Sequence, residues 1–389
     1  MSSASHATAH QRLAAIVSGL RYEDLPAEVI DRAKLLVLDS LGCLMGGLGG
    51  GPTVAVRGVV AEFGGKPAAT IIGTTTRTSA PLAALANGTA LRYLDFNDSY
   101  NSRRPGGHNT AHPSGNLPAA LAVAAAQGRS GRALIVALVL GYEIHMRLCE
   151  FAGDPSLRDR GWHNTTNLAL STAALAAWLM RNDPVLIAHA IAISATHQHT
   201  LSQLQEGAMA TIKASADGWV AKAGIEAAAL AAAGLSGPVD LFEGTAGWNM
   251  AVAGGMDYDG LTAPFGDFRI LRSRLKPFAA VGPAQGPVQA AVDVHNTGRA
   301  TPAEIERITV KVPARLLESP NASEARRYPQ TKEAADHSIF YVVVITLLEG
   351  NCVEAQYEPV KLTLPVVREL LAKVTIVADE EMTREPAFG

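Results

Sequence analysis

The densest group of chemically useful side chains follows a long apolar segment in the first third of the chain. The sequence DFNDSY starts at Asp95, directly after PLAALANGTALRYL, and His112 follows ahead of Pro113. Asp95 stands where an apolar helix should end, and the helix dipole disfavours a negative charge there. Such a break with a structural rule often marks a site. A carboxylate and an imidazole in this arrangement can act as general base and general acid. The structural alternative is an ordinary capped loop between two helices.

Three other residues could complete such a site. His112 precedes a proline, so its backbone should be extended, and it lies just ahead of a helix N-terminus, where anions bind well. His163 lies in a second loop, GWH, between two expected helices. Lys213 lies in a stretch of small residues, and Lys276 opens LKPFAAVGPAQGP near an expected domain junction, where ligands often bind. Taken alone, each is more often a packed histidine or a solvated lysine.

The elements that must position these residues change in kind along the chain. The first two thirds show helical apolar spacing, with Ser79 and Asn116 at helix starts. After about Gly254, alternating residues predict strands at 305–312 and 374–378, separated by an apolar helix over 334–348. We therefore expect a mostly α fold. A large all-helical domain spans 1–256, and a smaller α/β (α+β) lid domain spans 257–389.

Composition excludes several classes of protein. The 389 residues carry a net charge of −3, with 48% hydrophobic and 5% aromatic residues. A charge near zero argues against nucleic-acid binding, and this hydrophobicity argues against disorder. The apolar runs are shorter than the roughly 20 residues of a membrane span, so we expect a cytoplasmic protein. The three cysteines stand far apart, which argues against a disulfide framework, a zinc site or an iron–sulfur cluster.

Seven stretches together resemble the MmgE/PrpD family, whose members include 2-methylcitrate dehydratase, aconitate decarboxylase and an iminodisuccinate epimerase. They follow the family's order and cover most of the chain: LANGTALRYLDFNDSY, AHPSGNLPAALAVAAAQGRSGRALI, YEIHMRLCE, RDRGWH, GLSGPVDLFEG, RLKPFAAVGPAQ and YPQTKEAADHSIFYVVV.

The resemblance implies a helical domain and a lid with the active site between them, a homodimer, and no metal or cofactor. It also implies which residues form the site. The catalytic residues would be Asp95, His112, His163, Lys213 and Lys276, with Ser99 and Asp98 binding substrate.

Three departures from the family pattern bear on these expectations. The segment RRPGGHNTA is inserted between Ser102 and His112. His163-Asn164 replaces the Asp-His that is common after RDRGW in the dehydratase branch, and is closer to the decarboxylase-like branch. Relatives continue beyond the position of Gly389 with a strand and helices that return to the large domain, so we expect this chain to lack that segment.

The resemblance implies elimination of water from a 2-methylcitrate-like tricarboxylic acid, as in propionate metabolism. Such a hydro-lyase needs a base for a C–H proton, an acid for the leaving oxygen and cations for the developing charge. Asp95 or His112 would be the base, and His163 would be the acid or the oxyanion partner. Lys213 and Lys276 would hold carboxylates. The alternatives are aconitate-type decarboxylation, iminodisuccinate-type epimerisation, and an inactive helical scaffold without enzymatic activity.

Overall fold

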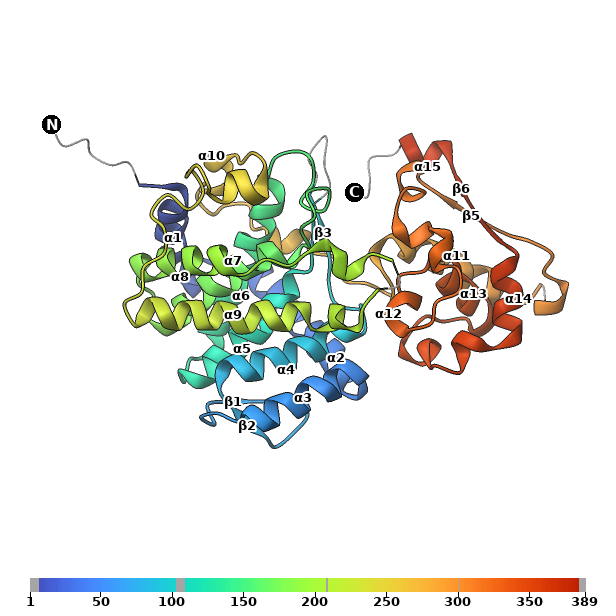
Figure 1. Ribbon diagram of the computed structural model, residues 1–389, viewed down its shortest axis with the longest axis horizontal. Coiled ribbons are helices and arrows are strands. Elements are labelled where there is room, and N and C mark those ends of the chain that lie inside the picture. Colours follow the sequence, from blue (N-terminus) through green and yellow to red (C-terminus); the bar gives the residue numbers. More distant parts are fainter. Residues whose placement is uncertain (1–6, 103–108, 208, 300, 385–389) are drawn as a thin grey trace. The chain divides into compact units, whose positions relative to one another are not determined.

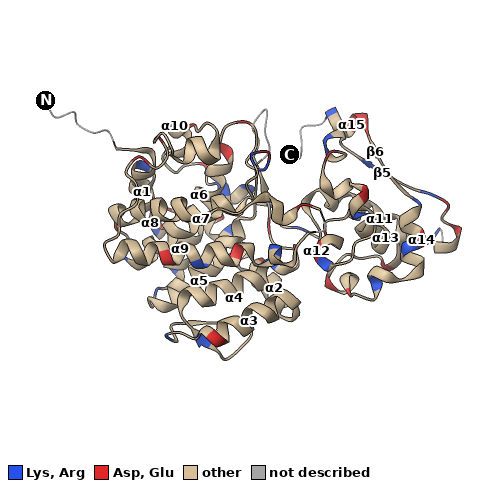
Figure 2. Cartoon of the chain, in the orientation of Figure 1, with Lys and Arg blue, Asp and Glu red and all other residues tan. Residues whose placement is uncertain are grey.

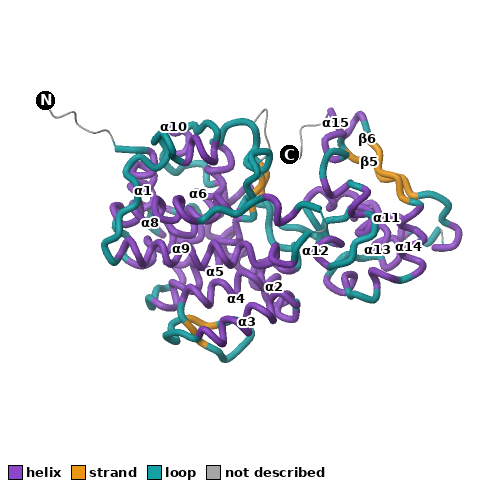
Figure 3. The backbone as a smooth tube through the Cα atoms, in the orientation of Figure 1, coloured by secondary structure: helices purple, strands orange, loops and turns teal. Residues whose placement is uncertain are grey.

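The structure, a computed structural model, describes residues 7–102, 109–207, 209–299 and 301–384 (Figure 1). It is mostly helical with a few short strands, which confirms the predicted fold class (Figure 3). The chain forms two compact units. The first contains the chain up to Tyr93, Asn97–Gln203 and Ala214–Leu275. The second contains Leu94–Phe96, Leu204–Lys213 and the chain from Lys276 onward, so it includes two short segments from within the predicted large domain.

The first unit is a stack of helices. They are α1 (Ala9–Gly19), α2 (Ala27–Gly46), α3 (Gly51–Phe63), α4 (Ala80–Tyr93), α5 (Asn116–Ala126), α6 (Gly131–Glu150), α7 (Thr165–Met180), α8 (Pro184–His197), α9 (Ala216–Ala232) and α10 (Tyr258–Leu261). Two antiparallel strand pairs accompany them, β1 (Ala69–Thr70) with β2 (Arg77–Thr78) and β3 (Tyr100–Asn101) with β4 (Thr110–Ala111).

The middle of this unit is built from helices that carry no charge. Helices α5, α7 and α8 contain no Asp, Glu, Lys or Arg and are tan throughout in Figure 2. Helix α7 packs against α6, α8 and α9, and nearly all of its residues are buried. Their ends follow local rules, because Asp183 accepts a hydrogen bond from Val185 N at 2.8 Å and Pro184 fills the first turn of α8.

Glycines let α4 and α9 approach closely. A Cβ added to Gly88 on α4 would lie 2.6 Å from the Cα of Gly218 on α9. We therefore expect Gly88→Ala to lower the free energy of unfolding by about 1–3 kcal/mol, because backbone must move to relieve the overlap. The matched control is Gly58→Ala on α3, where an added Cβ meets nothing within 4 Å. Urea denaturation of both variants tests this, and equal stability of the two would contradict it.

Burial also makes one histidine of this unit sensitive to acid. Burial lowers the pKa of His145, on α6, from 6.5 to about 3. The unfolded chain thus takes up a proton that the folded chain refuses, and the free energy of unfolding falls as the pH drops from about 6.5 to about 3. We expect His145→Leu to remove a slope of up to about 1.4 kcal/mol per pH unit. Urea denaturation between about pH 7 and about pH 4 measures this slope. If the free energy of unfolding of His145→Leu depends on pH as it does in the wild type, the expectation is contradicted. The control is His197→Gln, at an exposed histidine.

The second unit combines helices with a small parallel sheet. Its helices are α11 (Gln285–Asn296), α12 (Lys332–Ala335), α13 (Ile339–Glu349), α14 (Pro365–Ala372) and α15 (Glu380–Arg384). Strand β5 (Ile308–Val312) pairs in parallel with β6 (Val374–Ala378), from Ile308 opposite Val374 to Val312 opposite Ala378. Helices α11 and α13 pack on each other, and their apolar faces join β5 in one hydrophobic core.

The apolar helix predicted over 334–348 is wrong in one respect, because the structure divides it. Helix α12 ends at Ala335 and α13 begins at Ile339. Ser338 caps α13 by accepting a hydrogen bond from Tyr341 N at 3.1 Å, and its own hydroxyl donates to Arg326 O at 2.6 Å. A cap inside an apolar run interrupts the helix and leaves Asp336 and His337 in the turn between the two pieces.

Within the described ranges, no single helix is both long and apolar enough to cross a membrane. The pair Ala27–Gly49 and Gly51–Phe63 passes only when the two are taken together, by length and composition, across an 85° bend.

Candidate active site

The candidate site begins with an unusual backbone conformation at Asp95. This residue comes two positions after the end of α4 and has a φ of 52°, in the left-handed region. That region is costly for residues other than glycine, and such residues concentrate at functional sites. Met209, in the segment that leads to Lys213, has a φ of 53°. The predicted misfit at the end of α4 thus corresponds to a strained residue.

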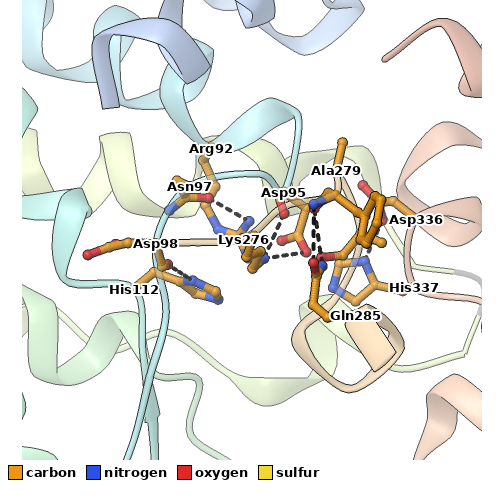
Figure 4. Close-up of polar contacts among 12 residues, drawn as sticks. Arg92, Asp95, Asn97, Asp98, His112, Lys276, Ala279, Gln285, Asp336 and His337 are labelled. Carbon is orange, nitrogen blue, oxygen red and sulfur yellow. Dashed lines mark hydrogen bonds and ion pairs between the residues drawn. The ribbon is translucent and has the colours of Figure 1, made fainter. Parts of the chain in front are cut away.

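The second unit brings three predicted residues together around the Asp95 carboxylate. Lys213 Nζ lies 3.0 Å from Oδ1, and Lys276 Nζ lies 3.0 Å from Oδ2. Lys276 also donates to the backbone oxygen of Asp95 at 2.6 Å (Figure 4). The exposed fractions are 1% for Asp95, 2% for Lys213 and 6% for Lys276. We call these three residues the Asp95 cluster.

The charges of the Asp95 cluster do not cancel. One carboxylate faces two ammonium groups, so the three side chains carry a net charge of +1 when all are ionised. Burying a charge is costly unless it is paired, because water no longer solvates it. The two ammonium groups therefore favour the binding of an anion at this site. A carboxylate would form charge-assisted hydrogen bonds with them.

Two side chains hold the loop that carries Lys276 by forming hydrogen bonds to its backbone. Gln285, the first residue of α11, donates from Nε2 to Phe278 O at 3.1 Å and to Ala280 O at 2.8 Å. Its Oε1 accepts from Phe278 N at 3.2 Å. Tyr357 Oη donates to the oxygen of Ala279, also in this loop, at 2.6 Å. The ammonium of Lys276 is thus held by a fixed backbone and not by a mobile loop end.

Two functional candidates that sequence reasoning missed lie in the turn between α12 and α13. Val281 N, at the end of the Lys276 loop, donates to Asp336 O at 2.9 Å. The Asp336 carboxylate accepts from Lys332 Nζ at 2.6 Å and from the ring of His337. Both residues are buried. The signal that could have revealed them is an acid followed by a histidine inside an otherwise apolar run.

The electrostatic surroundings connect this pair with the Asp95 cluster. Burial is the largest influence on the pKa of His337 and lowers it to about 4, with Lys213 acting in the same direction and Asp336 and Asp95 opposing. Burial raises the pKa of Asp336, but Lys332, His337 and Lys213 together bring it below its usual value. At neutral pH, His337 is therefore a neutral ring beside an ionised carboxylate.

His112 and Asp98, in the first unit, form a separate group of polar contacts. His112 is 8% exposed, and its Nδ1 lies 2.8 Å from Asp98 O. The Asp98 carboxylate accepts from Ser114 N at 3.0 Å, from Tyr142 Oη at 2.8 Å and from Ser273 Oγ at 2.5 Å. With three protein donors in place, Asp98 holds the loop. The substrate-binding role expected of it stays a prediction.

The other two predicted site residues of the first unit, His163 and Ser99, each contact different neighbours. His163 is 2% exposed, and its Nδ1 lies 2.9 Å from Thr165 Oγ1 at the start of α7. Ser99 is half-buried, and its backbone pairs with Arg274 in an antiparallel bridge. Their catalytic and binding roles stay predictions. Of the inserted segment between Ser102 and His112, residues 103–108 lie outside the described residues.

No group of three or more His, Cys, Asp or Glu side chains in the described ranges has the arrangement of a metal site. All three cysteines are buried and none is in a disulfide, as expected for small hydrophobic residues. Burial raises the pKa of the Cys149 thiol to about 12 and that of Cys352 to about 11, so neither is a ready thiolate.

Comparison with known families decides what kind of protein carries this site. The MmgE/PrpD N-terminal domain matches residues 11–261, and the MmgE/PrpD C-terminal domain matches residues 278–387. The chain belongs to the MmgE/PrpD family. The predicted resemblance is confirmed, and the break between the two family domains, at 262–277, contains the start of the second unit at Lys276.

Curated relatives of this MmgE/PrpD protein are lyases. The chain is 28% identical to the human cis-aconitate decarboxylase, over 94% of this chain and 76% of the relative. It is 25% identical to the cis-aconitate decarboxylase of Aspergillus terreus, over 95% and 78%. It is 26% identical to the 2-methylcitrate dehydratase of Cupriavidus necator, over 94% and 76%. The predicted enzyme class, a lyase, agrees with these relatives.

Proposed function

We propose that this protein is a cofactor-independent lyase that acts on a small tricarboxylic acid, with decarboxylation of cis-aconitate as the first candidate reaction. One observation carries the proposal, the buried Asp95 cluster with two ammonium groups on one carboxylate. Lyase chemistry on such an acid requires fixed cations, because negative charge develops on the substrate as the bond breaks.

The charge balance of the cluster suits a substrate with several carboxylates. A substrate carboxylate can take over hydrogen bonds from Lys213 and Lys276 without leaving either ammonium unpaired. Each such charge-assisted bond contributes about 1.5–3 kcal/mol. Burial strengthens these interactions, because the surrounding dielectric is low. Two lysines can thus hold two carboxylates of a tricarboxylate and leave the third free to depart as CO₂.

The sequence comparisons favour decarboxylation as the first candidate. The human and Aspergillus terreus relatives are named for decarboxylation of cis-aconitate, and His163-Asn164 is closer to the decarboxylase-like branch. Dehydration of 2-methylcitrate is the second candidate. It is supported by the relative from Cupriavidus necator and by the DFND and RDRGW segments, which resemble those of the 2-methylcitrate dehydratase branch.

One substrate panel tests both candidates. Purified protein, treated with a chelator, would be incubated separately with cis-aconitate, 2-methylcitrate, citrate and iminodisuccinate. We expect release of CO₂ from cis-aconitate together with formation of an unsaturated dicarboxylate. Growth of absorbance from 2-methylcitrate without CO₂ would instead select the hydro-lyase. Racemisation of iminodisuccinate alone would select an epimerase, and no conversion of any compound would contradict the proposal.

A further inference from the structure

We propose that His337, oriented by Asp336, carries the proton that the reaction delivers to substrate carbon. This inference rests on the proposed lyase function and deepens it, because it names a proton-transfer group that neither the sequence motifs nor the relatives assign. It is carried by the position of the pair beside the Asp95 cluster and by the hydrogen bond between its two members.

Hydrogen bonds connect the turn at 336–338 to both segments that carry the lysines. Val281 N, which follows the Lys276 loop, donates to Asp336 O at 2.9 Å. Arg326 donates from Nη1 to His337 O at 3.5 Å and from Nη2 to Gln205 O, in the segment that leads to Lys213. The turn is therefore fixed against the same two segments that place the ammonium groups.

The hydrogen bond to Asp336 fixes the tautomer of His337. A neutral imidazole has one N–H, and an ionised carboxylate can only accept. Nδ1 of His337 must therefore donate to Asp336, which leaves the lone pair on Nε2. Carboxylates orient catalytic histidines in this way and stabilise the imidazolium that forms when the second nitrogen takes a proton.

Charged groups around His337 are arranged so that substrate binding would load this ring with a proton. In the absence of ligand, burial and Lys213 hold the pKa near 4, against Asp336 and Asp95. Lys332 pairs with Asp336, and Glu333 interacts with Asp336, Lys332 and Lys213. Cys352 and Tyr357 are further titratable groups that interact with Asp336. A tricarboxylate bound to the lysines adds negative charge beside the ring, and the pKa of His337 rises.

In the proposed step, one C–C bond of the substrate breaks and one C–H bond forms. The bond between the departing carboxylate carbon and the adjacent CH₂ carbon breaks, and its electron pair forms a new C=C bond with the central carbon. The electrons of the original C=C bond take the proton from Nε2 of the His337 imidazolium. The products are CO₂ and a dicarboxylate, and His337 returns to the neutral form. The next substrate to bind restores the proton from solvent.

The first test measures proton uptake without turnover. Tricarballylate carries three carboxylates but lacks the double bond, so it can bind without reacting. Calorimetric titration in buffers of different ionisation enthalpy at about pH 7.5 should show uptake of up to about one proton per site in the wild type. His337→Gln should bind tricarballylate with little change in Kd and take up no proton. His295→Gln, at an exposed histidine of the same unit, should behave as the wild type.

The second test measures turnover. We expect His337→Gln to lower kcat by about 10²–10⁴-fold, as for loss of a general acid, with a small change in KM. Asp336→Asn, which can favour the wrong tautomer, should also lower kcat. If His337→Gln keeps both the kcat and the proton uptake of the wild type, this inference is overturned and the lyase proposal stays intact. A wild type that neither binds tricarballylate nor converts any carboxylate would overturn the lyase proposal itself.

If His337→Gln fails to fold, the wild-type protein decides the question. Protein labelled with ¹⁵N in its histidine rings would be examined by NMR with and without saturating tricarballylate. We expect the His337 Nε2 resonance to move from the unprotonated to the protonated range. A resonance that stays in the unprotonated range in the saturated complex would overturn the inference.

Discussion

Asp95→Asn should lower kcat/KM for the preferred substrate by about 10²–10⁴-fold, the range observed for groups that take part directly in catalysis. The carboxylate fixes both ammonium groups, with contacts of 3.0 Å to each. An amide cannot balance them, so the two ammonium groups would repel each other. The site would then lose the geometry that holds both cations in place. Steady-state kinetics on the substrate identified by the panel measures the effect.

Stability must be separated from activity in this variant. Removing the anion raises the net charge of the cluster from +1 to +2, and breaking a buried ion pair costs about 3–5 kcal/mol. The variant should therefore be assayed at low temperature after circular dichroism has shown it to be folded. Asp293→Asn, at an exposed carboxylate on α11, is the matched control. Near-wild-type kcat/KM in folded Asp95→Asn would contradict the role of Asp95 in fixing the two ammonium groups.

Lys276→Met should lower kcat/KM by about 10–100-fold, mainly through a higher KM. This magnitude corresponds to the about 1.5–3 kcal/mol of a hydrogen bond to a charged group. The Asp95–Lys213 pair remains and is neutral, so this variant should be more stable than Asp95→Asn. Lys276→Arg should not restore activity, because a planar guanidinium cannot replace a compact ammonium in a buried site.

The control for Lys276→Met is Lys311→Met, whose side chain is 64% exposed on β5 of the same unit. Kinetics and urea denaturation of both variants give the two quantities needed. A KM unchanged in Lys276→Met would show that this ammonium does not hold the substrate. If Lys276→Met is less stable than Asp95→Asn, the net charges that we assign to the cluster in the two variants are contradicted.

Much of the first unit could be predicted from sequence because its helices are long and their ends follow local rules. Ser79 and Asp183 stand directly before α4 and α8, and the apolar spacing between them identifies most of the intervening helices. Helix α11 was missed, because only Val288 and Ala291 of its residues are buried and the apolar spacing is weak. The division into α12 and α13 was missed for the opposite reason, since a continuous apolar run concealed the cap at Ser338.

Only part of the candidate site could be predicted from the sequence, because the site also depends on contacts between distant segments. Asp95 stood out because its charge conflicts with the helix end before it, and that conflict is local. Lys213 and Lys276 were identified through the family resemblance, since no spacing rule connects residues 118 and 181 positions away from Asp95. The assignment of 94–96 and 204–213 to the second unit depends on contacts between distant segments. Asp336 and His337 became candidates only when those contacts were known.

A crystal structure of the wild-type protein with tricarballylate tests the central claim most directly. The account predicts one ligand carboxylate oxygen within about 3.2 Å of Lys213 Nζ and another within about 3.2 Å of Lys276 Nζ. A complex in which the ligand binds elsewhere and contacts neither lysine would contradict it.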